Sequence, residues 1–204
     1  MQLSDKVINR LTLYHNILVG YMEKGVSFIS SPQIAVLLNI DASQVRKDLK
    51  LLNNDGICKV GYPVAELNRS IEKFLGFIKK KEAFIVGAGN LGMALAKYDN
   101  FGLYGFNILA LFDNDPLKVG LSINTKEVFH ISKLENLAGR LNVQIAILTV
   151  PRQFAQSVAD ILVKAGIKYI WNFSPCVIEV PESVKVWNEN LIGNFLQFTI
   201  NTID

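Results

Sequence analysis

Cysteine and histidine are scarce in this chain of 204 residues, which holds two of each. Cys58 and Cys176 lie far apart in the sequence and lack metal-ligand spacing, so we interpret both as ordinary packing or surface residues and expect no metal site. This cysteine usage fits a reducing compartment. No apolar stretch of about 18 residues is free of charge, and the N-terminus has no apolar signal region. We therefore expect a cytoplasmic protein without a membrane segment.

Side chains suited to hydride transfer are also few. A dehydrogenase needs a positioned acid or base, but His15 falls in an expected helix and His130 in an expected surface loop. No tyrosine is followed four residues later by lysine, the arrangement of short-chain dehydrogenases, and only 17 residues follow Trp187, the end of the last expected strand. We expect no enzyme and no catalytic residue, with a dehydrogenase as the rival class.

The most informative stretch is a glycine-rich turn between two expected elements. It follows the apolar run 83–86, opens onto an expected helix and consists of Gly87, Ala88, Gly89, Asn90, Leu91 and Gly92. Asp113 stands 21 residues after Gly92, at the end of the apolar run 108–112. Strand, glycine turn, helix, strand and acid in this order are typical of a dinucleotide-binding unit.

Each part of this pattern has a physical reason. The first glycine permits a tight turn, the second lets the backbone approach a pyrophosphate, and the third lets helix and strand pack closely. The pyrophosphate then lies against free N–H groups. Asp113 accepts hydrogen bonds from ribose hydroxyls and repels a 2′-phosphate, which favours NAD(H) over NADP(H). Two alternatives remain: a turn that only joins strand to helix, and a CoA- or nucleotide-binding module on the same kind of sheet.

The rest of the C-terminal part continues this α/β pattern. Further strands are expected at 144–150 and 169–173, joined by a helix that starts at Pro151 and stops at Gly166, with an edge strand at 184–187. A last apolar helix is expected at 190–203. It leaves four large side chains exposed unless something covers them, which suggests docking against a partner subunit: Leu191, Phe195, Phe198 and Ile203.

The first 82 residues have a different character. Helical spacing predicts helices at about 5–23, at 32–38 with Ile34, Leu37 and Leu38 inward, and from Asp41 to about Asn53. Two short helices joined by a tight connection are typical of a helix-turn-helix. The run from Ile57 to Val60 is expected to form a strand of a wing, with Lys59 near its tip.

The outer face of the third helix is rich in long hydrogen-bond donors, which suit phosphates and base edges in a major groove. Residues 1–82 carry a balance of +4, whereas residues 83–204 carry −1. This modest excess is compatible with nucleic acid. A three-helix bundle with a solvated basic face is the alternative. The candidate DNA contacts are Ser31, Gln44, Arg46, Lys47, Lys50 and Lys59.

Several blocks in order make the chain resemble the Rex family, the redox-sensing bacterial repressors that bind NADH. The resemblance covers nearly the whole chain. It is carried by residues 44–49 (QVRKDL) and 60–62 (VGY), by 86–92 (VGAGNLG) and 112–116 (FDNDP), and by 149–152 (TVPR) and 172–175 (NFSP).

The resemblance implies an α/β protein with a winged helix-turn-helix domain at 1–78, a Rossmann NAD(H)-binding domain at 79–188 and an exchanged, domain-swapped C-terminal helix at 189–204. It implies a homodimer that holds double-stranded operator DNA when NADH is scarce and releases it when NADH binds.

The resemblance also implies roles for single residues. Tyr98 helps to sense the reduced nicotinamide, although a half-buried aromatic at a helix end is the alternative. Asp113 holds the adenosine ribose, and Thr149, Val150 and Pro151 lie along the cofactor. Lys118, near Asp113, either contacts the ribose or is a solvated turn residue.

The chain departs from the family pattern in three respects. Lys50-Leu51-Leu52-Asn53 stands where the family usually has Ser-Tyr-Phe-Gly, and Ile57-Cys58-Lys59 replaces a wing with Lys-Arg-Gly. Lysine does not reproduce the fork of an arginine, so operator affinity or preference is expected to differ. Asn16 and Asn190 stand where an Arg and an Asp can pair in family members. Both charges are replaced together, so we expect NADH still to antagonise DNA, but less strongly than in a typical member of the family.

Overall fold

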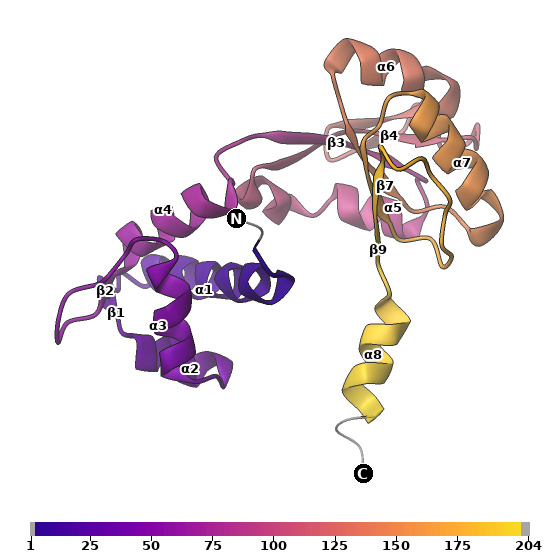
Figure 1. The fold of residues 1–204 in the computed structure, drawn as a ribbon. Coiled ribbons are helices and arrows are strands. Elements are labelled where there is room, and N and C mark those ends of the chain that lie inside the picture. The colour runs from indigo at the N-terminus through magenta and orange to yellow at the C-terminus, as the bar shows by residue number, and fades with distance from the viewer. Residues whose placement is uncertain (1–2, 201–204) are drawn as a thin grey trace. The chain divides into compact units, whose positions relative to one another are not determined.

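The computed structural model describes residues 3–200. The chain forms two compact units, one up to Lys79 and the other from Lys80 onward. The N-terminal unit contains α1 (Asp5–Glu23), β1 (Phe28–Ile29), α2 (Ser31–Leu38), α3 (Ala42–Lys50), β2 (Tyr62–Pro63) and α4 (Val64–Leu75), as Figure 1 shows. Its core is a single apolar cluster to which every helix contributes, including Leu11, Leu18, Ile34, Val45, Leu49, Leu67 and Ile71.

Local capping explains where the two short helices begin. Ser30 caps α2, and the side chain of Gln33 reaches back to the backbone N–H of Ser30 at 2.7 Å, which completes a capping box. Asp41 caps α3 by accepting the N–H of Ser43 at 2.6 Å. The connection between the helices passes through Asn39 in a left-handed conformation, with φ of +51°. The expected helix-turn-helix is therefore present.

Three details of the sequence prediction for this unit are wrong. Residues 57–60 form a turn rather than a strand, because the N–H of Gly61 bonds back to the carbonyl of Ile57 at 2.9 Å. The two-stranded sheet is made instead by β1 and β2, with Ile29 opposite Tyr62. Helix α3 ends at Lys50, three residues early, and Leu37 is 53% exposed rather than inward.

The C-terminal unit is a seven-stranded sheet in the order β5-β6-β4-β3-β7-β8-β9. All neighbours are parallel except the β5–β6 pair. Its strands are β3 (Lys81–Val86), β4 (Phe106–Asp113), β5 (Ser122–Ile123), β6 (Lys126–His130), β7 (Ile145–Leu148), β8 (Tyr169–Asn172) and β9 (Lys185–Asn188). The six parallel strands have the doubly wound order of a Rossmann fold, which reverses between β3 and β7.

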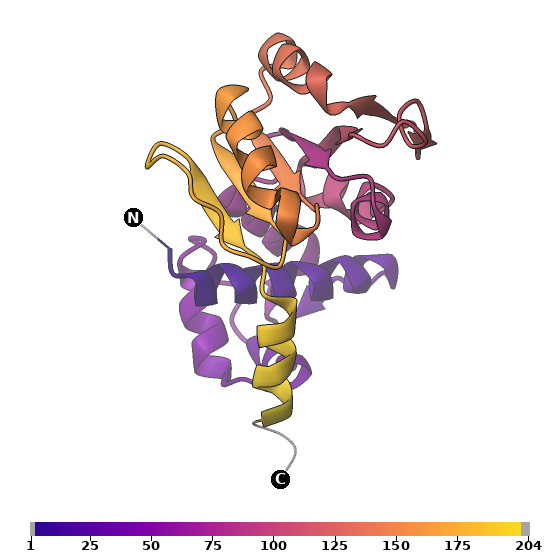
Figure 2. The same cartoon turned by 90° about the vertical axis from the view of Figure 1, so that its right-hand side faces the viewer.

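Helices cover both faces of this sheet (Figures 1 and 2). One face packs against α6 (Leu134–Leu141) and α7 (Arg152–Lys164), through residues such as Ala138 and Val158. The other face packs against α5 (Asn90–Ala96) and the 3-10 helix η1 (Asp99–Tyr104). A second 3-10 helix, η2 (Ile131–Lys133), leads into α6. The expected α/β sandwich is confirmed, including the edge strand at 184–187, which appears as β9.

The last described element is α8 (Leu191–Ile200). It buries no side chain within the chain, and its large apolar residues are between 47% and 72% exposed. The expectation of exposed Leu191, Phe195 and Phe198 is confirmed, whereas Ile203 lies outside the described residues. Within residues 3–200, no helix is long and apolar enough to cross a membrane. The same part of the chain contains no cluster of three His, Cys, Asp or Glu side chains that could hold a metal ion.

Candidate functional site

A cavity of about 430 Å³ opens at the carboxyl ends of β3, β4 and β7, where the strand order reverses. This is the place at which open α/β sheets bind ligands. The sequence prediction supplied seven of its lining residues: Gly87, Gly89, Asp113, Lys118, Thr149, Val150 and Pro151. It missed the other seven, which are Val86, Phe112, Asn114, Asp115, Ile131, Phe154 and Val158.

The glycine turn forms one wall of the cavity, and its backbone requires glycine at two positions. Gly87 has φ of +107°, and a Cβ there would lie 2.9 Å from the backbone of Thr149. A Cβ on Gly92 would collide with the carbonyl oxygen of Gly87. Thr149 closes this packing, because its hydroxyl donates to the carbonyl oxygen of Gly87 at 2.8 Å. Turn, helix and β7 are therefore fixed tightly together.

Gly89 differs from the other two glycines, because a Cβ at this position would meet nothing within 4 Å. Its missing side chain leaves open space above the turn rather than relieving a contact inside the protein. This is the condition that a pyrophosphate needs to approach the backbone closely. The turn therefore fits a dinucleotide. Ala88, Asn90, Leu91 and Gly92 build the turn but do not line the cavity.

Asp113 lies at the end of β4, with 14% of its side chain exposed. One carboxylate oxygen accepts the N–H of Ala88 at 2.8 Å and the amine of Lys118 at 3.2 Å, and the other accepts the N–H of Asp115 at 2.9 Å. Burial alone would raise the pKa of Asp113, but these bonds together outweigh burial and hold the pKa below its ordinary value. The carboxylate is therefore charged at neutral pH.

Lys118 is drawn toward the acid rather than toward solvent. Its amine lies 3.2 Å from Asp113 and 3.7 Å from Asp115, and about a third of the side chain is exposed. The cavity therefore holds a carboxylate and an ammonium group side by side at the position expected for the ribose. Lys118 therefore lines the cavity and pairs with Asp113, and its contact with a ribose stays a prediction.

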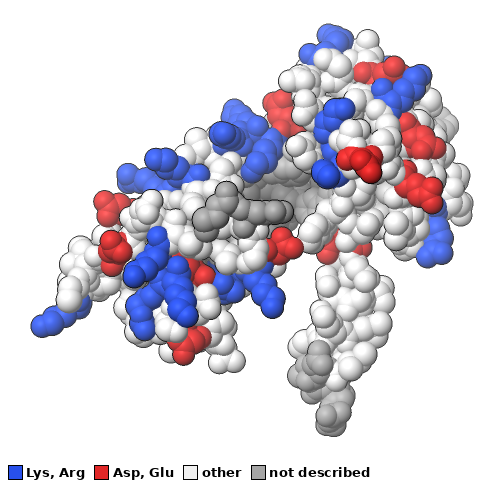
Figure 3. All heavy atoms as spheres, in the orientation of Figure 1, with Lys and Arg blue, Asp and Glu red and all other residues white. Residues whose placement is uncertain are grey.

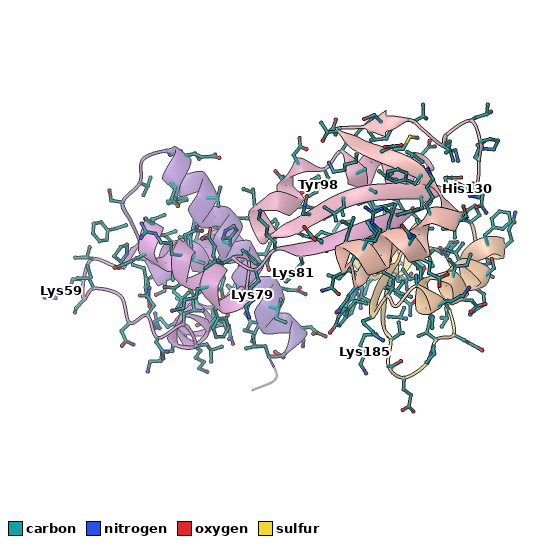
Figure 4. The ribbon with its side chains drawn as sticks, turned by 90° about the horizontal axis from the view of Figure 1, so that it is seen from above. Lys59, Lys79, Lys81, Tyr98, His130 and Lys185 are labelled. Atoms are coloured by element: carbon teal, nitrogen blue, oxygen red, sulfur yellow. The ribbon has the colours of Figure 1, made fainter. Side chains whose placement is uncertain are left out.

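Tyr98 does not line this cavity. It follows α5 at the end remote from the glycine turn and is 51% exposed. Its hydroxyl accepts a hydrogen bond from the amide of Asn100 at 3.3 Å, and its ring meets Phe101 edge-on. Figure 4 shows it well apart from His130, which ends β6 beside Asp113. The role of Tyr98 in sensing nicotinamide stays a prediction.

The second candidate site lies on the N-terminal unit. Arg46, Lys47 and Lys50 are exposed on α3, and Figure 3 shows Lys and Arg atoms gathered over this helix. Ser31 is buried, and its hydroxyl accepts a hydrogen bond from the guanidinium of Arg46 at 3.3 Å. Lys59 lies at the tip of the hairpin turn, residues 57–61, with φ of +64° (Figure 4). The neighbouring Cys58 is exposed.

The sequence analysis did not predict a buried network of hydrogen bonds and charges beneath α3. Asp48 is 2% exposed and accepts hydrogen bonds from Arg10 at 2.6 and 2.8 Å, from the hydroxyl of Tyr14 at 2.8 Å and from Gln44 at 2.9 Å. It ties α3 to α1. Gln44, a candidate DNA contact, therefore orients Asp48 as well. The available signal was an aspartate between Val45 and Leu49 on the apolar face of the helix.

Comparisons with known proteins match both units of the chain. A family model of the CoA binding domain matches residues 78–176, and one of the N-terminus of putative DNA-binding proteins matches residues 2–50. The redox-sensing transcriptional repressor Rex of Carboxydothermus hydrogenoformans is 42% identical over 200 residues, which are 98% of this chain and 96% of that protein. The Rex of Desulfitobacterium hafniense is 40% identical over 201 residues, with the same two shares.

Solved structures give the same answer. RSP, described as a Rex-family repressor, has been solved with β-NAD+ and operator DNA; that structure matches with a TM-score of 0.88 at 38% identity, over 98% of this chain and 93% of RSP. RSP with β-NADH matches with a TM-score of 0.85 at 37% identity, over 98% and 94%. The family is one of repressors rather than enzymes. With relatives this similar over nearly their whole length, the chain belongs to the Rex family of redox-sensing transcriptional repressors.

Proposed function

We propose that this chain represses transcription by holding operator DNA through α3 and the hairpin turn, and that NADH binding to the Rossmann unit releases the DNA. The proposal that the chain binds NADH rests on the cavity between β3 and β7, where the strand order reverses. There the open glycine turn lies beside the charged carboxylate of Asp113. The solved complexes of RSP with β-NADH, and with β-NAD+ and operator DNA, support the same pairing of ligands.

The proposed cofactor contacts follow from the geometry of the cavity. The pyrophosphate lies on the turn beside Gly89, and Asp113 accepts from the ribose hydroxyls. Thr149, Val150 and Pro151 line the path toward the nicotinamide, which carries the hydride that distinguishes NADH from NAD+. Because a ribose hydroxyl and the ammonium group of Lys118 both donate to Asp113, Lys118 shifts when the cofactor binds. Tyr98 completes the site only when the protein closes.

The proposed DNA contacts are the exposed cations on α3, with Arg46 held by Ser31. Each cation neutralises a phosphate or reaches a base edge. Two copies of the chain bind one palindromic operator, because a helix-turn-helix dimer matches the twofold symmetry of its site. The dimer forms by exchange of α8, whose exposed apolar face then packs against the partner. The protein acts in the cytoplasm, where its DNA lies.

A CoA module is the second candidate, because the matching family model of residues 78–176 is a CoA binding domain. CoA carries a phosphate on its adenosine ribose, and Asp113 would repel this group. The helix-turn-helix also has no use in a simple CoA module. Calorimetric titration of NADH, NAD+ and CoA into the full chain separates the candidates, and we expect NADH to bind most tightly.

A gel-shift experiment tests the whole proposal. The full chain should shift a palindromic DNA of the type bound by the family, and saturating NADH should reverse the shift while NAD+ should not. A scrambled duplex of the same composition is the control for charge-driven binding. If NADH binds by calorimetry and leaves operator affinity unchanged, the chain binds both ligands without being a redox switch.

A further inference from the structure

A row of aromatic rings crosses one face of the Rossmann unit, from the segment after α5 to β8. Phe101, in η1, meets Tyr98 with ring centroids 5.1 Å apart and Trp171 with centroids 6.3 Å apart, both edge-on. Trp171, in β8, meets Phe173 at 4.7 Å. Tyr98 and Phe101 lie in the segment that follows α5, and Trp171 and Phe173 lie in and just after β8. The row therefore links the segment after α5 to β8, which pairs with β9, the strand before α8.

Glu189 connects this row to the start of α8. Its carboxylate accepts the indole N–H of Trp171 at 3.2 Å, and its backbone N–H donates to the carbonyl of Asn172 at 2.8 Å. The other carboxylate oxygen lies 3.5 Å from the side-chain amide of Asn194 in α8. Glu189 is thus held by β8 at two points and touches α8 at a third.

The next residue fixes the first turn of the helix. Asn190 accepts the N–H of Gly193 through its side chain at 2.9 Å and the N–H of Asn194 through its carbonyl at 2.9 Å. This is N-cap geometry, which sets the direction in which a helix leaves the preceding strand. A shift of Glu189 therefore moves the cap, and a shift of the cap moves the whole of α8.

We propose that Trp171 and Glu189 are positioning residues, which make the direction of α8 depend on the segment that follows the cofactor turn. This inference rests on the proposed function, because it gives α8 its role in the switch. Cofactor binding at the turn displaces α5 and η1, Phe101 moves against Trp171, and the indole N–H carries the movement to Glu189. The exchanged helix then presents a different angle to the partner.

The chemistry of the pair suits this role. Both side chains are half-buried, so their hydrogen bond is less exposed to competition from water than a surface contact. A hydrogen bond to a charged acceptor is short-ranged and directional, so a small movement of the ring weakens it. Coupling between two sites requires an element whose arrangement both sites bias. In this proposal the cap at Asn190 is that element.

Matched variants test the proposal in the full chain. Trp171→Phe keeps the ring and removes the N–H, and Glu189→Ala removes the acceptor. Each should reduce the coupling factor, the ratio of operator Kd with and without saturating NADH, by about three-fold. Operator affinity without NADH should stay near wild type. Glu189→Gln retains an acceptor oxygen and should restore most of the coupling. Trp187→Phe, at an exposed tryptophan opposite Trp171 in β9, is the control.

The double variant gives a second comparison. If Trp171 and Glu189 act through one bond, Trp171→Phe combined with Glu189→Ala should reduce the coupling no further than either change alone. Losses that add in full would overturn the proposal, as would full coupling in both folded single variants. Circular dichroism and thermal unfolding verify that each variant folds.

A spectroscopic reading distinguishes this inference from the proposed function. In the Trp187→Phe chain, Trp171 is the single tryptophan, and its indole N–H gives one resonance in a ¹⁵N-labelled sample. That resonance should shift when NADH binds and when Glu189 becomes Ala. A shift with no DNA release would support the inference and contradict the proposed switch. DNA release by NADH with an unmoved resonance would overturn the inference and leave the switch intact.

Discussion

The carboxylate of Asp113 holds the second residue of the glycine turn, since it accepts the backbone N–H of Ala88 at 2.8 Å across 25 positions of sequence. In the proposed complex the acid has two functions. It fixes the turn that approaches the pyrophosphate, and it presents negative charge to the ribose. A change at Asp113 should affect cofactor binding through both.

Replacement of Asp113 by Ala should weaken NADH binding by about ten-fold or more, because a hydrogen bond to a charged group contributes about 1.5–3 kcal/mol. It should also narrow the preference for NADH over NADPH, since the repulsion of a 2′-phosphate disappears. Calorimetry with both cofactors measures this. Glu127→Ala is the control, because Glu127 is an exposed acid of β6 in the same unit and does not line the cavity. Equal affinity of the unaltered chain for NADH and NADPH would contradict the role of Asp113.

Lys118 should reduce the preference for NADH over NADPH, whereas Asp113 increases it. Its amine lies 3.2 Å from Asp113, so it offsets part of the charge that repels a 2′-phosphate and offers a cation to that phosphate. Lys118→Met should therefore weaken NADPH more than NADH and widen the preference. The ratio of the two dissociation constants is the measurement. An unchanged ratio would return Lys118 to the status of a solvated turn residue.

Asp48 should make the stability of the N-terminal unit depend on pH. Burial alone would raise its pKa, but hydrogen bonds from Arg10, Tyr14 and Gln44 outweigh burial and hold the pKa below its ordinary value. A carboxyl with a lowered folded pKa stabilises the fold above its unfolded pKa of about 4, and that contribution is lost as pH falls through the folded value.

Asp48→Asn should accordingly cost about 3 kcal/mol near neutral pH, because it leaves Arg10 without its charged partner. The difference from the unaltered chain should shrink as the solution is acidified below the unfolded pKa of about 4 and through the lower folded pKa. Denaturant unfolding at several pH values gives both quantities. Glu23→Gln, at an exposed carboxylate that ends the same helix as Arg10, should change neither. A cost for Asp48→Asn that does not vary with pH would show that packing alone matters there.

Sequence patterns predicted the elements whose form depends on residues close together in the chain. Caps and helical spacing located α1 and the start of α3 closely, and the glycine turn with Asp113 located the cavity. These features depend on residues near one another in sequence, or on a spacing that the fold always repeats. The position of β9 followed from a short apolar run for the same reason.

The features that were missed depend on distant contacts. The bond between Arg10 and Asp48 joins residues 38 positions apart, and nothing in either helix alone indicates it. The strand prediction at 57–60 was wrong because Ile57 and Val60 are residue types that favour strands. The strands that pair in this unit are β1 and β2, in which Phe28 lies opposite Pro63. Phe154 and Asn114 line the cavity only because α7 and the loop after β4 converge at one edge of the sheet.

Arg46 and Lys47 should carry operator affinity. Each is exposed on α3, and replacement by Ala should lower affinity and, where the side chain contacts a phosphate, reduce the salt slope by about one unit. Ser31→Ala should have a smaller effect in the same direction, since it frees Arg46 from its anchor. Lys73→Ala removes one exposed charge from α4 of the same unit and is the control. If the Arg46 and Lys47 variants keep their operator affinity at several salt concentrations, the basic face of α3 is only solvated and does not bind DNA.

Removal of α8 should abolish both the dimer and the coupling. The helix exposes Leu191, Ile192, Phe195, Leu196, Phe198 and Ile200, and burying a side chain of this size stabilises an assembly by about 1.5–3 kcal/mol. A chain that ends at Glu189 loses this contribution and should sediment as a monomer, while each Rossmann unit still binds NADH. Operator affinity should fall, because the two half-sites no longer share one protein.

In the full chain, NADH and operator DNA should weaken each other's binding. NADH should weaken operator binding by a factor in the lower part of the usual 5–150-fold range, since Asn16 and Asn190 replace the expected ion pair. Linkage requires that operator DNA weaken NADH binding by the same factor, so calorimetry with and without DNA provides an internal check. Phe195→Gln tests the apolar face without deleting the helix, and Thr199→Gln, at a polar position of α8, is its control. A truncated chain that remains dimeric with undiminished coupling would place the dimer interface elsewhere and remove α8 from the switch.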